Sequence, residues 1–403
     1  MSEWKTISAT DFCDSVRDGT HDTPKPTLNG FKLVTGKHLK NGVIDTSDAY
    51  YISESDYNKI NERSKVEQWD VLLSMIGTVG EVAVVKKQPD YAIKNIALFK
   101  CAGSELKGKW LAYYLRSPKA KGFFSGNQKG SSQQFLSLKQ LRNLPIVVAD
   151  ESYMKYVVDT LSRYDSLIEN YQKQIKLLEE AAQRLYKEWF VDLHFPGHEN
   201  TKIVDGVPEG WEKKKIADVC DTIGGGTPST KNSSYYEGGT ISWVTPTDIT
   251  RNNSLCLLST EKKITKEGLN HSSAKMLPKE TILMTSRASV GYFGICDFEV
   301  CTNQGFISCV PFEKNFQMYL LYNLMNRVEE IRIKAGGSTY LEISKSVFRN
   351  FDIICPPQSI TVNFQCQTHR ILEKTKNISK QIRLLTEARD RLLPKLMSGE
   401  IAV

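Results

Sequence analysis

Few residues in this 403-residue chain stand at spacings that could support catalysis. The nearest match is a nuclease-like set, in which Asp90 follows Pro89 and is followed later by Glu105 and Lys107. Two carboxylates and a lysine can bind Mg²⁺ and activate water for hydrolysis. This pattern is loose and arises by chance in many chains of this length, so a nuclease is an alternative interpretation and not the preferred one.

Three other motifs lack the residues that catalysis or cofactor binding requires. His194 and His198 are four apart, but Pro196 lies between them and prevents both from sharing a helical face. Residues 355–358 (Cys-Pro-Pro-Gln) lack the polar residue of an adenine-methyltransferase motif, and we expect them to begin a helix. Residues 224–226 (Gly-Gly-Gly) are not followed by the Lys-Ser/Thr of a phosphate loop. We therefore expect no metal and no cofactor in this chain.

The composition predicts a globular protein of the reducing cytoplasm. Lys and Arg total 53 and Asp and Glu total 46, so the net charge of +7 permits nucleic-acid binding without requiring it. The nine cysteines are scattered with no Cys-x-x-Cys pair, which predicts free and mostly buried thiols. The sequence has neither an apolar run long enough to cross a bilayer nor a signal-peptide pattern at its start, so we expect a cytoplasmic location.

The chain repeats itself with an offset of 207 residues. Trp4 recurs as Trp211, and Gly130-Ser131 recurs as Gly337-Ser338. Because this register holds from one end to the other, it indicates a tandem duplication with small compensating insertions inside each half. Two similar halves can present two similar surfaces about a pseudo-two-fold axis, an arrangement that suits duplex DNA.

Two segments have the heptad pattern of a coiled coil. Residues 151–190 contain no Gly or Pro, and nine consecutive a and d positions are apolar or aromatic. These are Leu161, Tyr164, Ile168, Tyr171, Ile175, Leu178, Ala182, Leu185 and Trp189. The second segment, about 358–398, has Ile371, Ile378, Leu385 and Leu392 at d and weaker a positions, namely Thr368, Thr375, Ile382, Arg389 and Leu396. Nine of thirteen residues are identical between 173–185 and 380–392. We predict two long helices that bury their seams against each other.

The fold class predicted is α+β, a pseudo-two-fold tandem repeat. Residues 1–150 and 201–357 are expected to be two similar mixed α/β domains. The segment 151–200 is expected to be a long helix and linker, and 358–403 a second long helix; if the two helices pair antiparallel, the domains lie at opposite ends of a rod. A 40-residue helix is about 60 Å long, and half-sites one turn apart on duplex DNA lie roughly 34 Å apart. Two such helices could therefore hold two readers over such sites.

Shorter patterns predict the local structure within each half. Residues 71–85 are expected to form a strand, a tight turn through Gly77 and Gly80, and a second strand. Residues 282–295 repeat that arrangement. Residues 109–115 and 317–332 are expected to be helices.

Three stretches resemble the DNA-specificity subunit of type I restriction–modification systems. They are 211–248 (beginning WEKKKIADVCDTIGGGTPSTKN), 183–199 (QRLYKEWFVDLHFPGHE) and the C-terminal RLLPKLMSGEI. The resemblance covers essentially the whole chain. It implies two target recognition domains, each reading one half of a split DNA sequence, joined by conserved helices that pack as an antiparallel coiled coil and set the unread gap.

The resemblance also implies that the chain is not itself an enzyme. It would direct two modification subunits, which methylate adenine with S-adenosylmethionine, and restriction subunits, which translocate and cleave double-stranded DNA with ATP and Mg²⁺. Two alternatives remain open beside this interpretation. One is a catalytic nuclease using the Asp90 set, and the other is a coiled-coil scaffold whose globular ends bind proteins.

Base contacts are expected in loops beside the duplicated framework positions. We predict DNA contacts in three pairs of equivalent loops, one loop of each pair in each half. The first pair contains Lys129, Ser131, Ser132, Gln133 and Gln134 in the first half and Ser338, Thr339 and Tyr340 in the second. The second pair contains Lys37 and His38 in the first half and Thr245, Thr247 and Asp248 in the second, and the third contains Arg287, before the second tight turn, at the position equivalent to Met75-Ile76. Because their side chains differ between the halves, we expect the halves to read different bases. Arg287 is the candidate bidentate reader of guanine.

Overall fold

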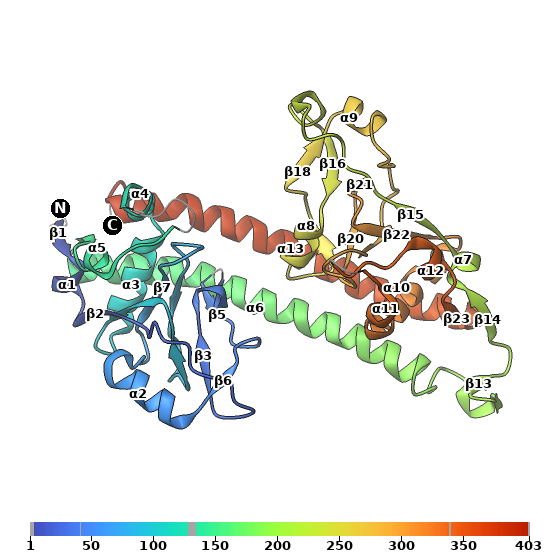
Figure 1. The fold of residues 1–403 in the computed structure, drawn as a ribbon, viewed down its shortest axis with the longest axis horizontal. Coiled ribbons are helices and arrows are strands. Elements are labelled where there is room, and N and C mark those ends of the chain that lie inside the picture. The colour runs from blue at the N-terminus through green and yellow to red at the C-terminus, as the bar shows by residue number, and fades with distance from the viewer. Residues whose placement is uncertain (1–3, 41, 128–133, 338–339, 402–403) are drawn as a thin grey trace. The chain divides into compact units, whose positions relative to one another are not determined.

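The computed structural model describes residues 4–40, 42–127, 134–337 and 340–401 (Figure 1). The chain forms two compact units, unit 1 (residues 1–166 and 385–403) and unit 2 (residues 167–384). Two long helices, α6 (Glu151–Phe190) and α13 (Gln358–Ser398), supply residues to both units. They begin next to the predicted boundaries at 150 and 357, while the division into four segments stays a prediction.

Unit 1 is built from four small sheets, one of them the two-stranded pair β4-β5, and the helices that cover them. Strands β2-β10-β7-β8 form an antiparallel sheet, β6-β3-β9 form a second sheet, and β1 pairs with β11. The elements before α6 are β1 (Lys5–Ser8), α1 (Ala9–Phe12), β2 (Ser15–Asp18), β3 (Phe31–Val34), η1 (Gly36–His38), β4 (Leu39–Lys40), β5 (Val43–Ile44), β6 (Tyr51–Ile52), α2 (Glu54–Ser64), β7 (Val71–Ser74), β8 (Val82–Val84), β9 (Tyr91–Ile93), β10 (Ile96–Lys100), α3 (Glu105–Arg116), α4 (Pro118–Asn127), α5 (Leu138–Arg142) and β11 (Pro145–Val148).

Unit 2 repeats this order of elements. Its sheets are β15-β22-β19-β20-β17, β18-β16-β21, β14-β23 and β12-β13. After α6 come η2 (His198–Asn200), β12 (Ile203–Val204), β13 (Val207–Pro208), β14 (Glu212–Lys215), α7 (Ile216–Val219), β15 (Cys220–Gly224), η3 (Ser233–Tyr235), β16 (Ile241–Val244), α8 (Pro246–Thr250), β17 (Cys256–Leu257), β18 (Lys262–Ile264), α9 (Lys266–Asn270), β19 (Ile282–Thr285), β20 (Phe293–Cys296), β21 (Cys301–Thr302), β22 (Phe306–Pro311), η4 (Lys314–Phe316), α10 (Gln317–Asn326), α11 (Val328–Lys334), α12 (Lys345–Arg349) and β23 (Asp352–Cys355). The predicted duplication and the α+β class are confirmed.

The two long helices pack antiparallel within each unit. In unit 1 the Tyr153 hydroxyl, near the start of α6, donates to the carbonyl of Leu396, near the end of α13, at 3.0 Å. In unit 2 the end of α6 meets the start of α13. There the rings of Tyr186 and Trp189 pack on the Phe364 ring, with centroids 6.1 and 5.9 Å away. Antiparallel pairing is thus confirmed on each side.

The predicted seam of α6 is buried at one position of each heptad and half-buried at the other, where Tyr164, Tyr171, Leu178 and Leu185 lie. Leu161, Ile168, Ile175, Ala182 and Trp189 of α6 are all buried. The weak a positions Thr368 and Thr375 of α13 are buried as well, although they are polar. The Thr368 hydroxyl donates to the carbonyl of Phe364 at 2.7 Å, which satisfies one of these groups inside its own helix.

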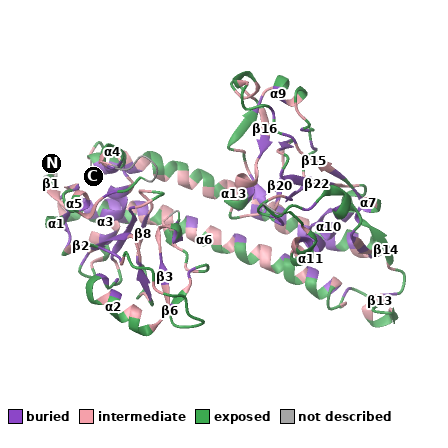
Figure 2. Cartoon of the chain, in the orientation of Figure 1, coloured by how far each residue is buried: buried purple, intermediate pink, exposed green. Residues whose placement is uncertain are grey.

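Each unit has its main core where a short helix meets its sheet and the long helices. In unit 1 the buried residues of α3 pack with β7, β10, α6 and α13, and in unit 2 those of α10 pack with the equivalent elements. Trp110 Nε1 donates to the Val147 carbonyl at 3.0 Å, and the Tyr319 hydroxyl donates to the equivalent carbonyl of Ile354. Figure 2 shows strands such as β8 and β20 largely buried, while α2 is largely exposed.

Two local predictions are refined by the structure. Both tight turns form as predicted, with Gly77 and Gly80 at φ of 77° and 102°, in the left-handed region that glycine favours. The helix predicted over 317–332 is instead two helices, because Arg327 has non-helical angles and uses its guanidinium on Glu330 and on the Asp352 carbonyl. Unit 1 breaks at the equivalent place, where Pro118 begins α4. The nine cysteines are free thiols, and all but Cys366 are buried.

Candidate nucleic-acid interface

One edge of the sheets in unit 2 gathers five loops, because their strands end in register. Val244, the last residue of β16, lies opposite Thr302 of β21, and Thr285 of β19 lies opposite Phe306 of β22. Gly224 of β15 lies opposite Ile307 of the same strand β22. We call the loops that follow or connect these residues the loop edge of unit 2, which comprises residues 225–228, 245–248, 286–291, 303–305 and 340–343.

Unit 1 has an equivalent loop edge, which comprises residues 19–23, 35–38, 75–80, 94–95 and 134–136. Here Val34 of β3 lies opposite Ile93 of β9, and Ser74 of β7 lies opposite Ile96 of β10. Asp18 of β2 lies opposite Ala97. The same strand register therefore brings together the same five loops in both units.

Matching backbone hydrogen bonds join the tight turn to the loop before α5 or α12. In unit 2, Ala288 N donates to Leu341 O at 2.8 Å, and Ile343 N donates to Ser286 O at 3.0 Å. In unit 1, the same roles fall to Gly77 N with Gln134 O at 3.1 Å and to Leu136 N with Met75 O at 2.9 Å. Two of the three predicted loop pairs thus lie side by side in each unit.

Arg287 and Tyr340, both predicted to contact DNA, are in contact with each other. The Arg287 guanidinium lies over the Tyr340 ring at 4.4 Å from the centroid, and its Nε lies 3.5 Å from a carboxylate oxygen of Glu342. Both side chains are accessible, with 34% of the Arg287 side chain and 41% of Tyr340 exposed. A guanidinium that is stacked and ion-paired before binding loses less freedom when it engages a base edge.

The loops 35–38 and 245–248 begin short helices in the same way. His38 and Asp248 each stand three residues after a threonine and accept its backbone N–H, at 2.7 Å to His38 Nδ1 and at 2.8 Å to Asp248 Oδ2. The Thr245 hydroxyl also donates to Asp248, at 2.7 Å, while Thr247 is half-buried. These side chains therefore have a local capping role, whether or not they also contact DNA.

His38 is the least accessible of the predicted contacts, with 1% of its surface exposed. Its Nε2 lies 3.3 Å from Asp48 Oδ1 without a hydrogen bond. Burial lowers the pKa of His38 below 6.5 against the opposing influence of Asp48, so the neutral ring is favoured. The neighbouring Lys37 is exposed and donates to Asp48 at 2.9 Å, which lowers the pKa of that carboxyl.

The remaining predicted contacts divide into one described residue and several outside the described part of the chain. Gln134 is exposed on the loop edge of unit 1. Lys129, Ser131, Ser132, Gln133, Ser338 and Thr339 lie outside the described residues. Base contact by any of these side chains stays a prediction.

Sequence reasoning missed two polar residues on the connection from β9 to β10 and its equivalent in unit 2. Lys94 donates to the Thr23 hydroxyl on the loop edge of unit 1. Gln304 accepts from the Thr227 hydroxyl on the loop edge of unit 2. No motif marks either residue, and only the internal alignment, whose offset grows to 210 at this point, would have paired them.

The structure does not support the motifs considered for catalysis. The Glu105 carboxylate pairs with Lys109 at 2.6 Å, and His194 Nδ1 contacts Glu188 at 2.9 Å. Within the described ranges, one group of three or more His, Cys, Asp or Glu side chains has metal-compatible spacing, and it includes neither Glu105 nor His194. None of the helices in the described part of the chain is both long and apolar enough to span a bilayer.

A family model described as the type I restriction modification DNA specificity domain matches residues 1–180 and 208–392. The chain belongs to this family. The two matched segments fall on the two halves of the duplication, so the type I specificity family model recognises the same repeat that the strand order shows.

Relatives in the type I specificity family differ in how much of the chain they match. The MjaIX specificity subunit of Methanocaldococcus jannaschii is 36% identical over 152 residues, which are 37% of this chain and 35% of that relative. The HindI specificity subunit of Haemophilus influenzae is 25% identical over 66% of this chain and 71% of its own length. The putative MjaX specificity subunit of M. jannaschii is 21% identical over 100% of this chain and 94% of its length.

A solved structure of the S subunit from M. genitalium has the same fold. It superposes with a TM-score of 0.55 at 14% identity and covers 98% of this chain and 96% of its own. The two-unit architecture with paired long helices is therefore shared by members with little sequence identity.

Proposed function

We propose that this chain is the non-catalytic subunit of a type I restriction–modification complex that reads double-stranded DNA. Each loop edge reads one half of a bipartite target. Partner subunits, namely two modification subunits and restriction subunits, supply the chemistry with S-adenosylmethionine, ATP and Mg²⁺. Membership of the family and the names of the relatives support this proposal.

One observation carries the proposal, namely that equivalent loops share a backbone and differ in side chains. Equivalent backbone hydrogen bonds flank Arg287 in unit 2 and Ile76 in unit 1. Where unit 2 has Gln304, unit 1 has Lys94. Similar loops with different hydrogen-bonding groups present different donors and acceptors to a groove. The two units are thus suited to two unlike half-sites.

The test is an exchange of recognition domains. Residues 1–150 are replaced by those of another family member, and adenine methylation is mapped genome-wide in cells that hold the partner subunits. One half of the methylated sequence should change and the other should stay. The reciprocal exchange of residues 201–357 is the matched control and should change the other half. If either exchange altered both halves, the assignment of one half-site to each unit would be wrong.

The two alternatives make different predictions for the purified chain. A scaffold that binds only proteins would show no binding to duplex DNA at low salt, where phosphate contacts are strongest. A nuclease would cleave DNA with Mg²⁺ and lose that activity on Asp90→Ala. We expect salt-dependent duplex binding without cleavage.

A further inference from the structure

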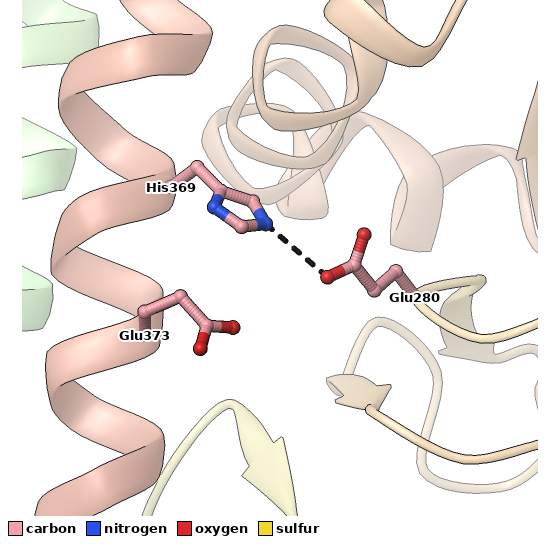
Figure 3. A group of neighbouring side chains, drawn as sticks. All are labelled: Glu280, His369 and Glu373. Atoms are coloured by element: carbon pink, nitrogen blue, oxygen red, sulfur yellow. Dashed lines mark hydrogen bonds and ion pairs between the residues drawn. The ribbon is translucent and has the colours of Figure 1, made fainter.

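Unit 2 holds a cluster of two carboxylates and an imidazole away from its loop edge. Figure 3 shows His369 and Glu373 on successive turns of α13, facing Glu280 from the turn before β19. His369 Nε2 lies 3.2 Å from Glu280 Oε1, and one ligand atom from each of the three residues lies within 4.8 Å of the other two. All three side chains are half-buried.

The backbone fixes Glu280 in place. It has a φ of 63°, which is uncommon for a residue with a side chain, and its N–H donates to Cys296 O at 2.8 Å. Gln317 donates through its side chain to the Glu280 carbonyl. His369 and Glu373 are four apart in a helix, so their side chains project from the same face. Three potential ligands therefore converge from two anchored elements.

The spacing suits a metal ion. Ligand atoms about 2.1 Å from one ion lie roughly 3.0–3.4 Å from each other in octahedral or tetrahedral geometry. The 3.2 Å between His369 Nε2 and Glu280 Oε1 falls within that range. The Glu373 carboxylate, which pairs with Lys376 at 2.5 Å, lies within 4.8 Å of the other two ligand atoms.

The charge around the cluster also favours a cation. The carboxylates of Glu280, Glu373 and Asp297 face two ammonium groups, because Lys376 lies 3.7 Å and Lys380 lies 3.2 Å from Asp297. These three carboxylates and two ammonium groups together leave one net negative charge. A small cavity of about 10 Å³, room for about one water molecule or one ion, is lined in part by Glu280, Asp297, Glu373 and Lys376.

The ligand set is absent from the otherwise equivalent place in unit 1. Trp69 occupies the turn of Glu280, with a φ of 70° and its N–H bonded to Val85 O at 2.7 Å. At the offset of 207, Ser162 and Ser166 replace His369 and Glu373. The shared fold therefore does not require these residues, and their convergence is a property of unit 2 alone.

We propose that Glu280, His369 and Glu373 bind one divalent transition-metal cation of the Zn²⁺ class and thereby fasten α13 to the β19–β20 hairpin. An imidazole with two carboxylates suits Zn²⁺ and its neighbours, whereas Mg²⁺ prefers oxygen ligands alone. Three protein ligands leave room for water. The role is structural, and it does not depend on which DNA sequence the loop edges read.

The experiment titrates the full-length chain, first stripped of metal, with Zn²⁺ in competition with a chromophoric chelator. Co²⁺ is added separately to record the absorption spectrum of the bound ion. The variants are His369→Ser, which copies unit 1, and Glu280→Gln. The matched control is His271→Ser in the same unit, whose ring contacts the Glu267 carbonyl and the Tyr235 ring. Circular dichroism verifies that each variant is folded.

The native chain should bind one Zn²⁺ at this site, and Zn²⁺ should raise its thermal midpoint. His369→Ser and Glu280→Gln should each weaken binding by more than about tenfold, since even an outer-shell partner is typically worth that much. His271→Ser should bind as the native chain does. Lys376→Met should bind more tightly, because it removes the ammonium group that competes for Glu373.

Three results would overturn the proposal. The first is an absence of Zn²⁺ binding by the native chain. The second is undiminished binding by both His369→Ser and Glu280→Gln, which would place the ion elsewhere. The third is displacement of Zn²⁺ by Mg²⁺ at comparable concentration, which would contradict the imidazole ligand.

Discussion

Replacement of Arg287 should relax the reading of a single base pair in the half-site of unit 2. The guanidinium already lies 4.4 Å from the Tyr340 ring centroid and is ion-paired through Nε to Glu342. It is therefore ordered before DNA arrives. A bidentate contact to guanine is worth about 1–3 kcal/mol of discrimination, which corresponds to a preference of roughly 5- to 150-fold at that position.

Two substitutions separate charge from geometry. Arg287→Ala should abolish the preference for guanine. Arg287→Lys keeps the charge but has no planar fork, so it should retain overall affinity and lose most of the preference. Tyr340→Ala removes the stacking partner and should cost about 0.5–1 kcal/mol, or roughly a two- to fivefold loss of preference. Arg349→Ala, at an exposed position on α12 of the same unit, is the matched control.

The assay uses duplexes in which the second half of the target, once identified by methylation mapping, is randomised one base pair at a time. Binding is measured at two salt concentrations. A loss of affinity that is uniform across all bases, with a shallower dependence on salt, would identify Arg287 as a phosphate contact and refute the reasoning. Relaxation in the other half-site would refute the assignment of the units.

Three further predictions concern stability and are measured by urea unfolding. Burial lowers the pKa of His38, so its contribution to stability is present above its unfolded pKa and is lost as the pH falls below about 6.5; His38→Asn should keep the cap and flatten that dependence. Burial raises the pKa of Glu179, so the folded chain favours the neutral carboxyl. The contribution of Glu179 to stability is therefore lost as the pH rises through this raised pKa. Glu179→Gln keeps an acceptor for Leu255 N, so at neutral pH its free energy of unfolding should be equal to or higher than that of the native chain. This difference in free energy should vanish in acid, where Glu179 is protonated. Asp165 contacts Arg389 at 2.7 Å, and both side chains are about four-fifths buried. Asp165→Ala should therefore lower the free energy of unfolding by about 2 kcal/mol. A change below about 0.5 kcal/mol would show that solvent screens the pair.

The sequence predicted the features that rest on repetition. The offset of 207 residues and the heptads of residues 151–190 and 358–398 predicted the duplicated α+β units and two paired long helices, because periodic burial leaves a periodic pattern. The antiparallel direction of these helices was implied by the family resemblance. The sequence also named Arg287 and Tyr340 as candidate DNA contacts beside duplicated positions, and the contact between them comes from the structure.

The rest depended on contacts that have no local signature. His38 was expected to be accessible, but its ring folds back as a cap and is buried. The break at Arg327 depends on a guanidinium that reaches the distant Asp352 carbonyl. The cluster of Glu280 and His369 joins residues 89 apart in the chain, and the repeat could not indicate it because only one copy has it.

The distribution of burial explains how the halves could diverge in function without diverging in fold. The bonds from Trp110 and Tyr319 to equivalent carbonyls lie where short helices meet sheets, and both cores draw on the long helices. The loop edges are held by matching backbone hydrogen bonds, such as those of Ala288 with Leu341 and of Gly77 with Gln134, together with side-chain caps. Arg287 stands where unit 1 has Ile76, a half-buried side chain that packs on the edge of the unit 1 core. On the proposed function, a change in the bases read needs substitution on the loop edge alone, while α6 and α13 keep the packing that each unit needs.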